Sequence, residues 1–217
     1  MKVAIKYADA SHVHHAEKIC ILIEEAAKIR GTGIARRVPE YIRSKIEHGN
    51  AVIALSGNEV VGFCYIETWG HSMYVVNSGL IVHPEFRKTG LARKIKEKIF
   101  LLSKERFPEA KIFGITTSLA VMKINSDLGY KPVTFSELTK DEAFWKGCQS
   151  CPNVDILNRT GHSHCLCTGM LYTPDQKKIE NGVGKRYRWG RFKRFMKFHK
   201  IKFERKVRSS AKKTSKL

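Results

Sequence analysis

Short apolar runs alternate with helical patterns over most of the chain. Runs of four to ten residues, several of them β-branched, predict strands, and a Ser-Gly-Asn turn joins the second and third into a hairpin. Apolar residues at spacings of three and four between these runs predict amphipathic helices. The expected strands are Val3–Tyr7, Ala51–Leu55, Val60–Glu67, Met73–Val82, Lys111–Thr117 and Leu166–Tyr172, and the expected helices follow Asp9 or Ser11, start at Pro39, start near Ala92, span Ser118–Asp127 and follow Thr139 in a capping-box pattern.

The stretch from Ser78 to Phe107 organises the chain. An apolar run, Leu80-Ile81-Val82, passes into a basic turn that contains Gly90 and then into an amphipathic helix. A strand, a tight glycine turn and a helix N-terminus present free backbone N–H groups and the positive end of a helix dipole. This arrangement suits the binding of phosphate.

The turn resembles the acyl-CoA motif of the GNAT (Gcn5-related) N-acetyltransferases, because Arg-x-x-Gly-x-Ala follows a strand that ends Val-His-Pro. Neither Gly-x-Gly-x-x-Gly nor Gly-x-x-x-x-Gly-Lys-Ser/Thr occurs in the chain, which argues against a Rossmann or P-loop site. The resemblance implies an α/β fold with a central, mostly antiparallel sheet whose middle strands splay to admit acetyl-CoA or another short acyl-CoA. It assigns the pantetheine arm to Leu80, Ile81 and Val82, and the pyrophosphate to Arg87, Lys88, Thr89, Gly90, Leu91 and Ala92.

The helix before Gly129-Tyr130 resembles the last motif of the same family. Many members carry a tyrosine four residues before this glycine, where it protonates the leaving thiolate. Asn125 stands at that position here. The resemblance therefore predicts that Asn125 contacts the pantetheine amides or the sulfur of CoA, without a tyrosine acid.

Two other segments are candidates for the acceptor site. Arg30, Arg36 and Arg37 crowd a glycine-containing loop, which in the family lies over the acceptor. Arginine binds carboxylates in a bidentate manner, so the loop either binds an acidic acceptor or is a solvated basic loop. Glu67 and His71 are candidates for the base that deprotonates the acceptor amine, or else an exposed strand-end charge and a turn residue. His83 is a third candidate.

Four cysteines near residue 150 form two close pairs. Cys148 and Cys151 are followed, after thirteen residues, by Cys165 and Cys167. Two pairs of thiolates favour a structural zinc ion, and the alternative is a set of reduced thiols packed beneath the last strand. Together with Phe144-Trp145 and Met170-Leu171, the cysteines make residues 50–172 similar to the short-form N-acetylglutamate synthases. This resemblance implies transfer to the α-amine of glutamate or a similar acidic amino acid, at the start of arginine biosynthesis.

The charge of the chain is concentrated at its C-terminal end. Of a net charge of +20, residues 176–217 carry +15, from 17 Lys or Arg against two acids. We therefore expect an acyltransferase domain over residues 1–174, with the cysteine-bearing segment 148–167 at its end, and a basic aromatic tail over residues 175–217. The tail has the composition of a segment that binds nucleic acid or an anionic membrane, or of a solvated tail.

The tail also defines a second functional hypothesis, a domain of this family that acylates a macromolecule or only binds acyl-CoA. No apolar run is long enough for a membrane span and the first residues lack the apolar core of a secretion signal. We therefore expect a cytoplasmic protein, and the resemblance allows a homodimer.

Overall fold

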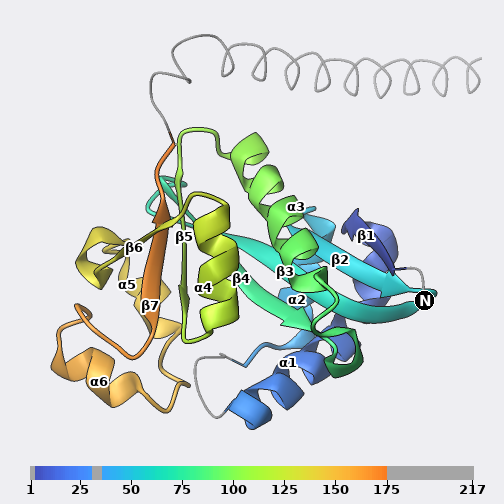
Figure 1. The fold of residues 1–217 in the computed structure, drawn as a ribbon, viewed down its shortest axis with the longest axis horizontal. Helices are drawn as coiled ribbons and strands as arrows, with labels where there is room; N and C mark the ends of the chain where they lie inside the picture. Colours follow the sequence, from blue (N-terminus) through green and yellow to red (C-terminus); the bar gives the residue numbers. More distant parts are fainter. Residues whose placement is uncertain (1–2, 31–35, 175–217) are drawn as a thin grey trace, which may run out of the picture. The chain divides into compact units, whose positions relative to one another are not determined.

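The computed structural model describes residues 3–30 and 36–174. Seven strands form one sheet in the order β1-β2-β3-β4-β5-β7-β6 (Figure 1). The strands are β1 (Val3–Tyr7), β2 (Ala51–Ser56), β3 (Glu59–Trp69), β4 (Tyr74–Val82), β5 (Lys111–Thr116), β6 (Lys131–Val133) and β7 (Thr168–Tyr172). The helices are η1 (Ala10–His15), α1 (Ala16–Arg30), α2 (Pro39–Glu47), η2 (Pro84–Phe86), α3 (Leu91–Arg106), α4 (Leu119–Asp127), η3 (Phe135–Glu137), α5 (Glu142–Lys146) and α6 (Val154–Arg159).

The middle of the sheet opens between β4 and β5. These two strands form the single parallel pairing of the described sheet, and all its other pairings are antiparallel. Their pairing covers only three positions, from Tyr74 opposite Lys111 to Val76 opposite Phe113. Beyond Val76 the strands separate, which leaves the edge of β4 unpaired on that side. The predicted α/β fold with a mostly antiparallel, splayed sheet is confirmed.

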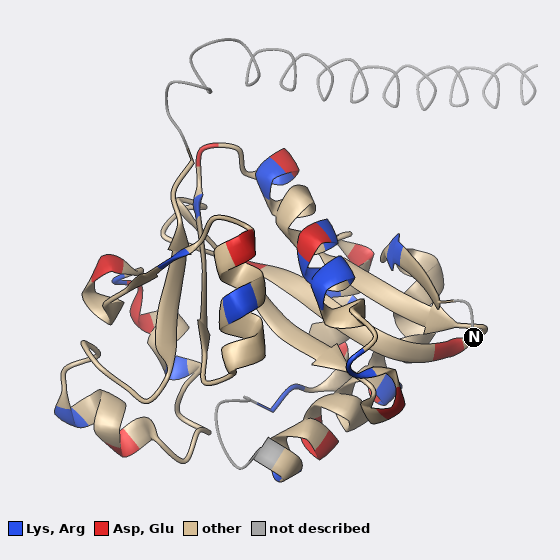
Figure 2. Cartoon of the chain, viewed as in Figure 1, with Lys and Arg blue, Asp and Glu red and all other residues tan. Residues whose placement is uncertain are grey.

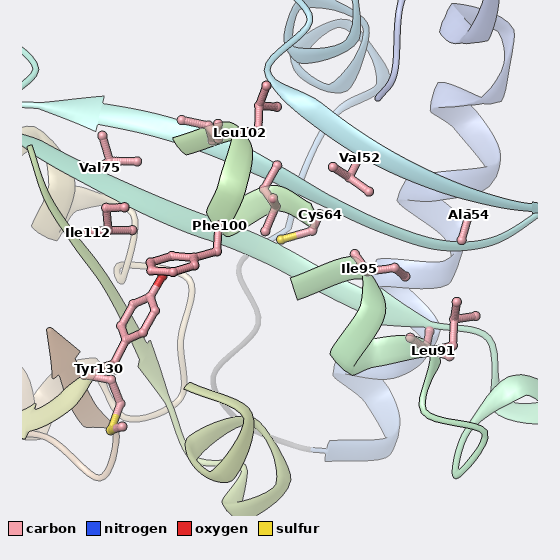
Figure 3. Close-up of a cluster of buried hydrophobic side chains, with 14 of the residues drawn as sticks. Val52, Ala54, Cys64, Val75, Leu91, Ile95, Phe100, Leu102, Ile112 and Tyr130 are labelled. Atoms are coloured by element: carbon pink, nitrogen blue, oxygen red, sulfur yellow. The ribbon is translucent and has the colours of Figure 1, made fainter. Parts of the chain in front are cut away.

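Each face of the sheet is covered by different helices. Side chains alternate between the faces along a strand, so Val52 and Ala54 pack with α3, whereas Ile53 and Leu55 pack with α1 and α2. Figure 3 shows the first of these clusters between α3 and the sheet. A third cluster joins β5 and β7 to the segments η3, α5 and α6. The molecule therefore has three layers, with the sheet in the middle.

An irregularity in β4 lies beside the opening. Tyr65 pairs with Ser78 but Phe63 pairs with Ile81, so Gly79 and Leu80 have no partner residue on β3. Gly79 adopts a φ of +65°, and a Cβ there would lie 2.3 Å from the Tyr65 ring. Only glycine fits this position without displacing Tyr65. The bulge turns the backbone of β4 where the strand edge is already free.

Several predicted boundaries need correction. Asp9 caps a 3₁₀ helix, η1, and α1 begins only at Ala16. Thr139 is not an N-cap, because Asp141 caps α5 by accepting a hydrogen bond from the Ala143 N–H at 3.0 Å. The last strand starts at Thr168, so Cys165 and Cys167 precede it. Helix α6 lies between the cysteine pairs, where no helix was expected.

The predictions for the basic tail fall on residues 175–217, outside the described residues. The same holds for the glycine loop over residues 31–35, and the side chain of Arg30 is not described either. Among the helices that the structure describes, none is both long enough and apolar enough to cross a membrane.

Candidate active site

A cavity of about 520 Å³ occupies the opening between β4 and β5. Its walls come from β3, β4 and β5, from α3 and α4, and from the segments around α2, α5 and α6. Polar groups gather at two places in this wall. One set lies on the α2 side of β4 and includes Arg37, Tyr41, Glu67 and Ser78, and the other lies on the α3 side and includes Asn77, Lys96 and Asn125.

The predicted phosphate turn has the expected geometry. Gly90 caps α3 in the left-handed region at a φ of 80°, and an added Cβ would meet no atom within 4 Å. No side chain caps α3, and its first turn holds no acidic residue. Arg87 and Lys88 lie in the turn, and Figure 2 shows residues of both charge signs along α3. The N–H groups of the first turn are therefore available to an anion.

The apolar end of β4 leads from this turn into the cavity. Leu80 and Ile81 line the cavity, while Val82 is buried and its carbonyl accepts a hydrogen bond from Arg87 Nε at 3.3 Å. Leu91 is buried beneath the turn, and Thr89 donates a hydrogen bond to the carbonyl of Phe86 at 2.7 Å. An extended ligand bound at the turn can follow this free strand edge into the opening.

Glu67 lies on the cavity wall in a defined hydrogen-bond network. Its carboxylate accepts a hydrogen bond from the Tyr41 hydroxyl and a second, of 2.6 Å, from Ser78 Oγ. Burial and the negative charge of Glu67 raise the pKa of Tyr41 far above its usual value, so the phenol remains a donor. A carboxylate held in this way can accept a proton from an amine in the cavity, directly or through water.

Arg37 stands next to this carboxylate. Its Nε donates a hydrogen bond of 2.6 Å to the Tyr65 hydroxyl, and its guanidinium lies 5.4 Å from the centre of the Tyr41 ring. Burial disfavours its charge, but Tyr65 and Glu67 outweigh this effect and raise the pKa of Arg37 above its usual value. Arg36 also lines the cavity but is exposed. The structure thus brings two of the three predicted arginines to the site.

The two histidine candidates lie elsewhere. His71 is exposed in the turn between β3 and β4, with a φ of 55°, and is not part of the cavity wall. His83 lies at the end of β4, also outside the wall, and its Nδ1 is buried without a hydrogen-bond partner. Of the three candidate bases, Glu67 is the one that the structure places in the cavity.

Asn125 lies in the cavity wall on α4, only 1% exposed, and its Oδ1 has no hydrogen-bond partner. An unsatisfied buried carbonyl is costly, so this oxygen is suited to receive a donor from a bound ligand. Asn125 thus lies on the cavity wall, and its predicted contact with CoA stays a prediction.

The sequence analysis did not identify Lys96, a residue of α3 that also lines the cavity. It is 2% exposed, and its Nζ donates a hydrogen bond of 3.3 Å to Asn77 Oδ1. Tyr130 donates to the same oxygen at 3.0 Å, and Asn77 Nδ2 donates to Ser103 Oγ at 2.7 Å. Phe100, four residues on, is an apolar neighbour on the same side of α3, but a lysine at such a position of an amphipathic helix ordinarily faces solvent.

All four cysteines of the two pairs line the cavity. Within residues 3–30 and 36–174, however, no three or more His, Cys, Asp or Glu side chains are arranged to hold a metal ion. Four thiolates would suit zinc chemically, but this arrangement gives the zinc prediction no support. Burial, reinforced by neighbouring cysteines, raises the pKa of Cys148 to about 11 and that of Cys167 to about 12. Both are neutral thiols near pH 7, which matches the alternative interpretation of packed reduced thiols.

Comparison with known proteins agrees with this architecture. Residues 32–118 match the Acetyltransferase (GNAT) family. The matched residues include the turn before α3, so the resemblance to this family that the turn indicated is confirmed for this segment of the chain.

The similar proteins differ in acceptor. Thialysine N-epsilon-acetyltransferase of Caenorhabditis elegans is 27% identical over 139 residues, which are 60% of this chain and 83% of that protein. N-acetylglutamate synthase from Neisseria gonorrhoeae, solved with coenzyme A and N-acetyl-glutamate, has a TM-score of 0.57 and 16% identity. The match covers 81% of this chain but only 36% of that one.

Diaminobutyrate acetyltransferase from Paenibacillus lautus, solved with its substrate and coenzyme A, has a TM-score of 0.54 and 11% identity, covering 80% of this chain and 95% of the other. At these identities the solved structures show a common fold. The acceptor must be argued from the site itself.

Proposed function

We propose that the protein transfers an acetyl or other short acyl group from acyl-CoA to the α-amine of an acidic amino acid, with glutamate as the first candidate. The observation that carries the proposal is the cavity between β4 and β5. Its wall runs from Leu80 and Ile81, on the strand that leads to the turn before α3, to a carboxylate beside an arginine. Acylation of glutamate would belong to the start of arginine biosynthesis.

Acyl-CoA would bind with its pyrophosphate at residues 87–92 and its pantetheine along Leu80–Val82. A guanidinium at Arg37 suits the carboxylates of the acceptor, since arginine recognises this group with two parallel hydrogen bonds. Arg36, exposed at the rim, would add long-range attraction for an anionic acceptor. The acceptor amine would then lie near Glu67, which shares the same wall.

The chemistry is a direct transfer. Glu67 takes a proton from the acceptor ammonium, and the free amine attacks the thioester carbon. The carbon–nitrogen bond forms as the carbon–sulfur bond breaks. Beyond Val76 the edge of β4 that faces β5 is unpaired, and a backbone N–H on this edge is suited to stabilise the negative charge on the carbonyl oxygen. Holding both substrates in one cavity supplies a large share of the rate.

A matrix of acyl donors and acceptors tests the proposal. The purified full-length protein is assayed with acetyl-, succinyl- and propionyl-CoA against glutamate, aspartate, lysine, thialysine, diaminobutyrate and a peptide N-terminus. We expect the highest kcat/KM with an acidic amino acid. Turnover of lysine or diaminobutyrate alone would overturn the acidic acceptor, while the acyltransferase assignment would stand.

The remaining sequence-based expectations stay predictions. They are a cytoplasmic enzyme, a homodimer, and a tail over residues 175–217 that binds nucleic acid or anionic membrane. The tail is tested by removing residues 175–217 and measuring both amino-acid acylation and salt-dependent binding of RNA or anionic vesicles. Full acylation activity together with lost binding would show that the tail binds the partner but is not needed for acyl transfer.

A further inference from the structure

Lys96 is a buried cation without a counter-charge. Its ammonium has three donors, yet the hydrogen bond that the structure gives it goes to Asn77 Oδ1, at 3.3 Å. No carboxylate within the described residues forms an ion pair with it. Its other contact is the face of the Tyr130 ring, whose centre lies 5.2 Å from Nζ. A buried ammonium is costly unless an anion or dipole compensates it.

The position of Lys96 within the cavity suggests which anion compensates its charge. Acyl-CoA bound at the turn before α3 and lying along the free edge of β4 would extend from Val82 towards Asn77. The strands meet again at Val76 opposite Phe113, so the reactive end of the ligand must stop near Asn77. Lys96 and Asn125 line the cavity at this end, from α3 and α4. The groups that face the closed end of the opening are therefore a cation and an unpartnered amide oxygen.

The two faces of β4 separate these groups from the acceptor. Asn77 pairs opposite Ile66 and bonds to Ser103 on the α3 side, whereas Ser78 pairs opposite Tyr65 and bonds to Glu67 on the other side. An amine that attacks from the Glu67 side pushes the sulfur away from it. The departing sulfur would then move towards the α3 side, where Lys96 lies.

From this geometry we infer that Lys96 is a catalytic residue that donates a proton to the CoA sulfur as the thioester breaks. The inference rests on the proposed acyl transfer. The electron pair of the carbon–sulfur bond remains on sulfur and takes a proton from Nζ, which leaves CoA as a thiol and Lys96 as a neutral amine. The proton removed from the acceptor passes through Glu67 to solvent, and Lys96 is reprotonated from solvent, so one turnover is balanced.

The electrostatics of the site fit this role. Burial lowers the pKa of Lys96 to about 8, close to the pKa of about 8.5 of an ordinary thiol. A donor and a leaving group of similar pKa exchange a proton efficiently. The titratable groups that face Lys96 are Cys64 on β3 and Tyr130 after α4. Burial raises the pKa of Cys64 to about 11 and that of Tyr130 well above its usual value, so both are neutral near pH 7.

The test measures the ionisation of the thiol of bound CoA, which requires no acceptor. The ultraviolet absorbance of the thiolate is followed against pH for CoA bound to wild-type protein and to Lys96→Met, Lys96→Arg and the control Lys98→Met. Lys98 lies on the same helix, over the ring of Tyr7, and outside the cavity wall. We expect a lowered thiol pKa in wild type, in Lys98→Met and in Lys96→Arg. In Lys96→Met we expect the pKa of free CoA.

Kinetics with the best acceptor provide the second readout. Loss of a proton donor lowers kcat by about 100-fold in Lys96→Met, with KM for both substrates nearly unchanged. Lys96→Arg retains a cation but holds its proton too tightly to donate it, so kcat should also be lowered and should not show the decline above about pH 8 that we expect in wild type.

The outcomes separate this inference from the proposed function. An unchanged thiol pKa in folded Lys96→Met, checked by circular dichroism, overturns the inference even if glutamate is acylated. A lowered wild-type thiol pKa without turnover of any amino acid supports the role of Lys96 and rejects the proposed acceptor.

Discussion

The two faces of β4 hold their polar groups in opposite ways. On the α2 side, Glu67 accepts hydrogen bonds from Tyr41 and Ser78, and Arg37 donates to Tyr65. On the α3 side, Lys96 has one neutral acceptor and the face of an aromatic ring. The first arrangement holds a carboxylate among hydroxyl donors and beside a guanidinium, whereas the second holds a cation with which no carboxylate of the described residues forms an ion pair.

This difference matches the chemistry expected on each side. The acceptor arrives with its own charges and needs orientation, which a rigid hydrogen-bonded network provides. The thioester arrives neutral and develops negative charge on sulfur only as it breaks, and an uncompensated cation favours that state over the ground state. The pKa values follow the same division, because burial together with Glu67 raises those of Tyr41 and Tyr65 while burial lowers that of Lys96.

The largest expected effect is that of Glu67→Gln. The amide keeps the size of the side chain but cannot accept a proton, so kcat should fall by roughly 100- to 1,000-fold. Glu59→Gln, on the same strand but exposed, is the matched control and should leave kcat unchanged. The binding of CoA and the pKa of its thiol should not change in either variant. Full activity in Glu67→Gln would show that Glu67 is not the base.

The next effect concerns stability and the cost of the buried cation. The folded-state pKa of Lys96 lies below its unfolded value, so folding releases a proton between about pH 8 and pH 10.5. The penalty is fully present below about pH 8 and is relieved as the pH rises through this window. Lys96→Met should therefore increase the free energy of unfolding at pH 7 by about 1–3 kcal/mol, since Asn77 Oδ1 still accepts from Tyr130.

Urea denaturation at pH 7 and pH 10 measures this effect. The advantage of Lys96→Met over wild type should shrink at the higher pH. Lys98→Met, which removes a charge that is not buried, should show no such pH dependence. A Lys96→Met protein that is less stable than wild type at both pH values would show that the lysine mainly supports packing.

A third experiment tests whether Arg37 binds the carboxylate of the acceptor. Arg37→Lys keeps the charge but loses the planar fork and the hydrogen bond to Tyr65. We expect KM for the acidic amino acid to rise about tenfold, with KM for acetyl-CoA unchanged. Arg43→Lys is the control, because Arg43 lies on α2 but pairs with Glu17 and Glu40 outside the cavity. Equal KM values for glutamate in both variants would exclude Arg37 as the carboxylate-binding group.

On the α3 side of β4, the turn before α3 could be predicted from the sequence, but Lys96 could not. The turn before α3 was recognisable as a candidate phosphate site because the motif is a short, local run of residues around Gly90. Lys96 was missed because a lysine in an amphipathic helix ordinarily faces solvent. Its burial depends on β4, α4 and Tyr130, which are distant in sequence, and no local pattern contains them.

On the α2 side of β4, the charged residue was predicted from the sequence, but the residues that hold it were not. Glu67, predicted as a candidate base, lies on the cavity wall, and the hairpin that carries it was evident from alternation. Tyr41 and Ser78, which hold it, were not identified, since each is an ordinary helix or strand residue until the strands pair. The zinc prediction finds no support among the described residues, because cysteine spacing alone does not fix how the thiols are arranged around a common point.

The smallest expected effect tests the entrance to the cavity. Gly90 adopts a φ of 80° at the N-terminus of α3, where alanine costs about 1 kcal/mol in backbone strain. Its Cβ would meet no protein atom within 4 Å, so any further loss must come from the ligand. Gly90→Ala should therefore weaken CoA binding about tenfold by blocking close approach to the backbone, while the thiol of bound CoA keeps its lowered pKa. Gly57→Ala, at a φ of 60° in the β2–β3 turn with equally open space, should show the same strain but normal CoA affinity. If both variants bind CoA equally well, the turn before α3 is not the phosphate site, and the direction in which acyl-CoA enters the opening must be reversed.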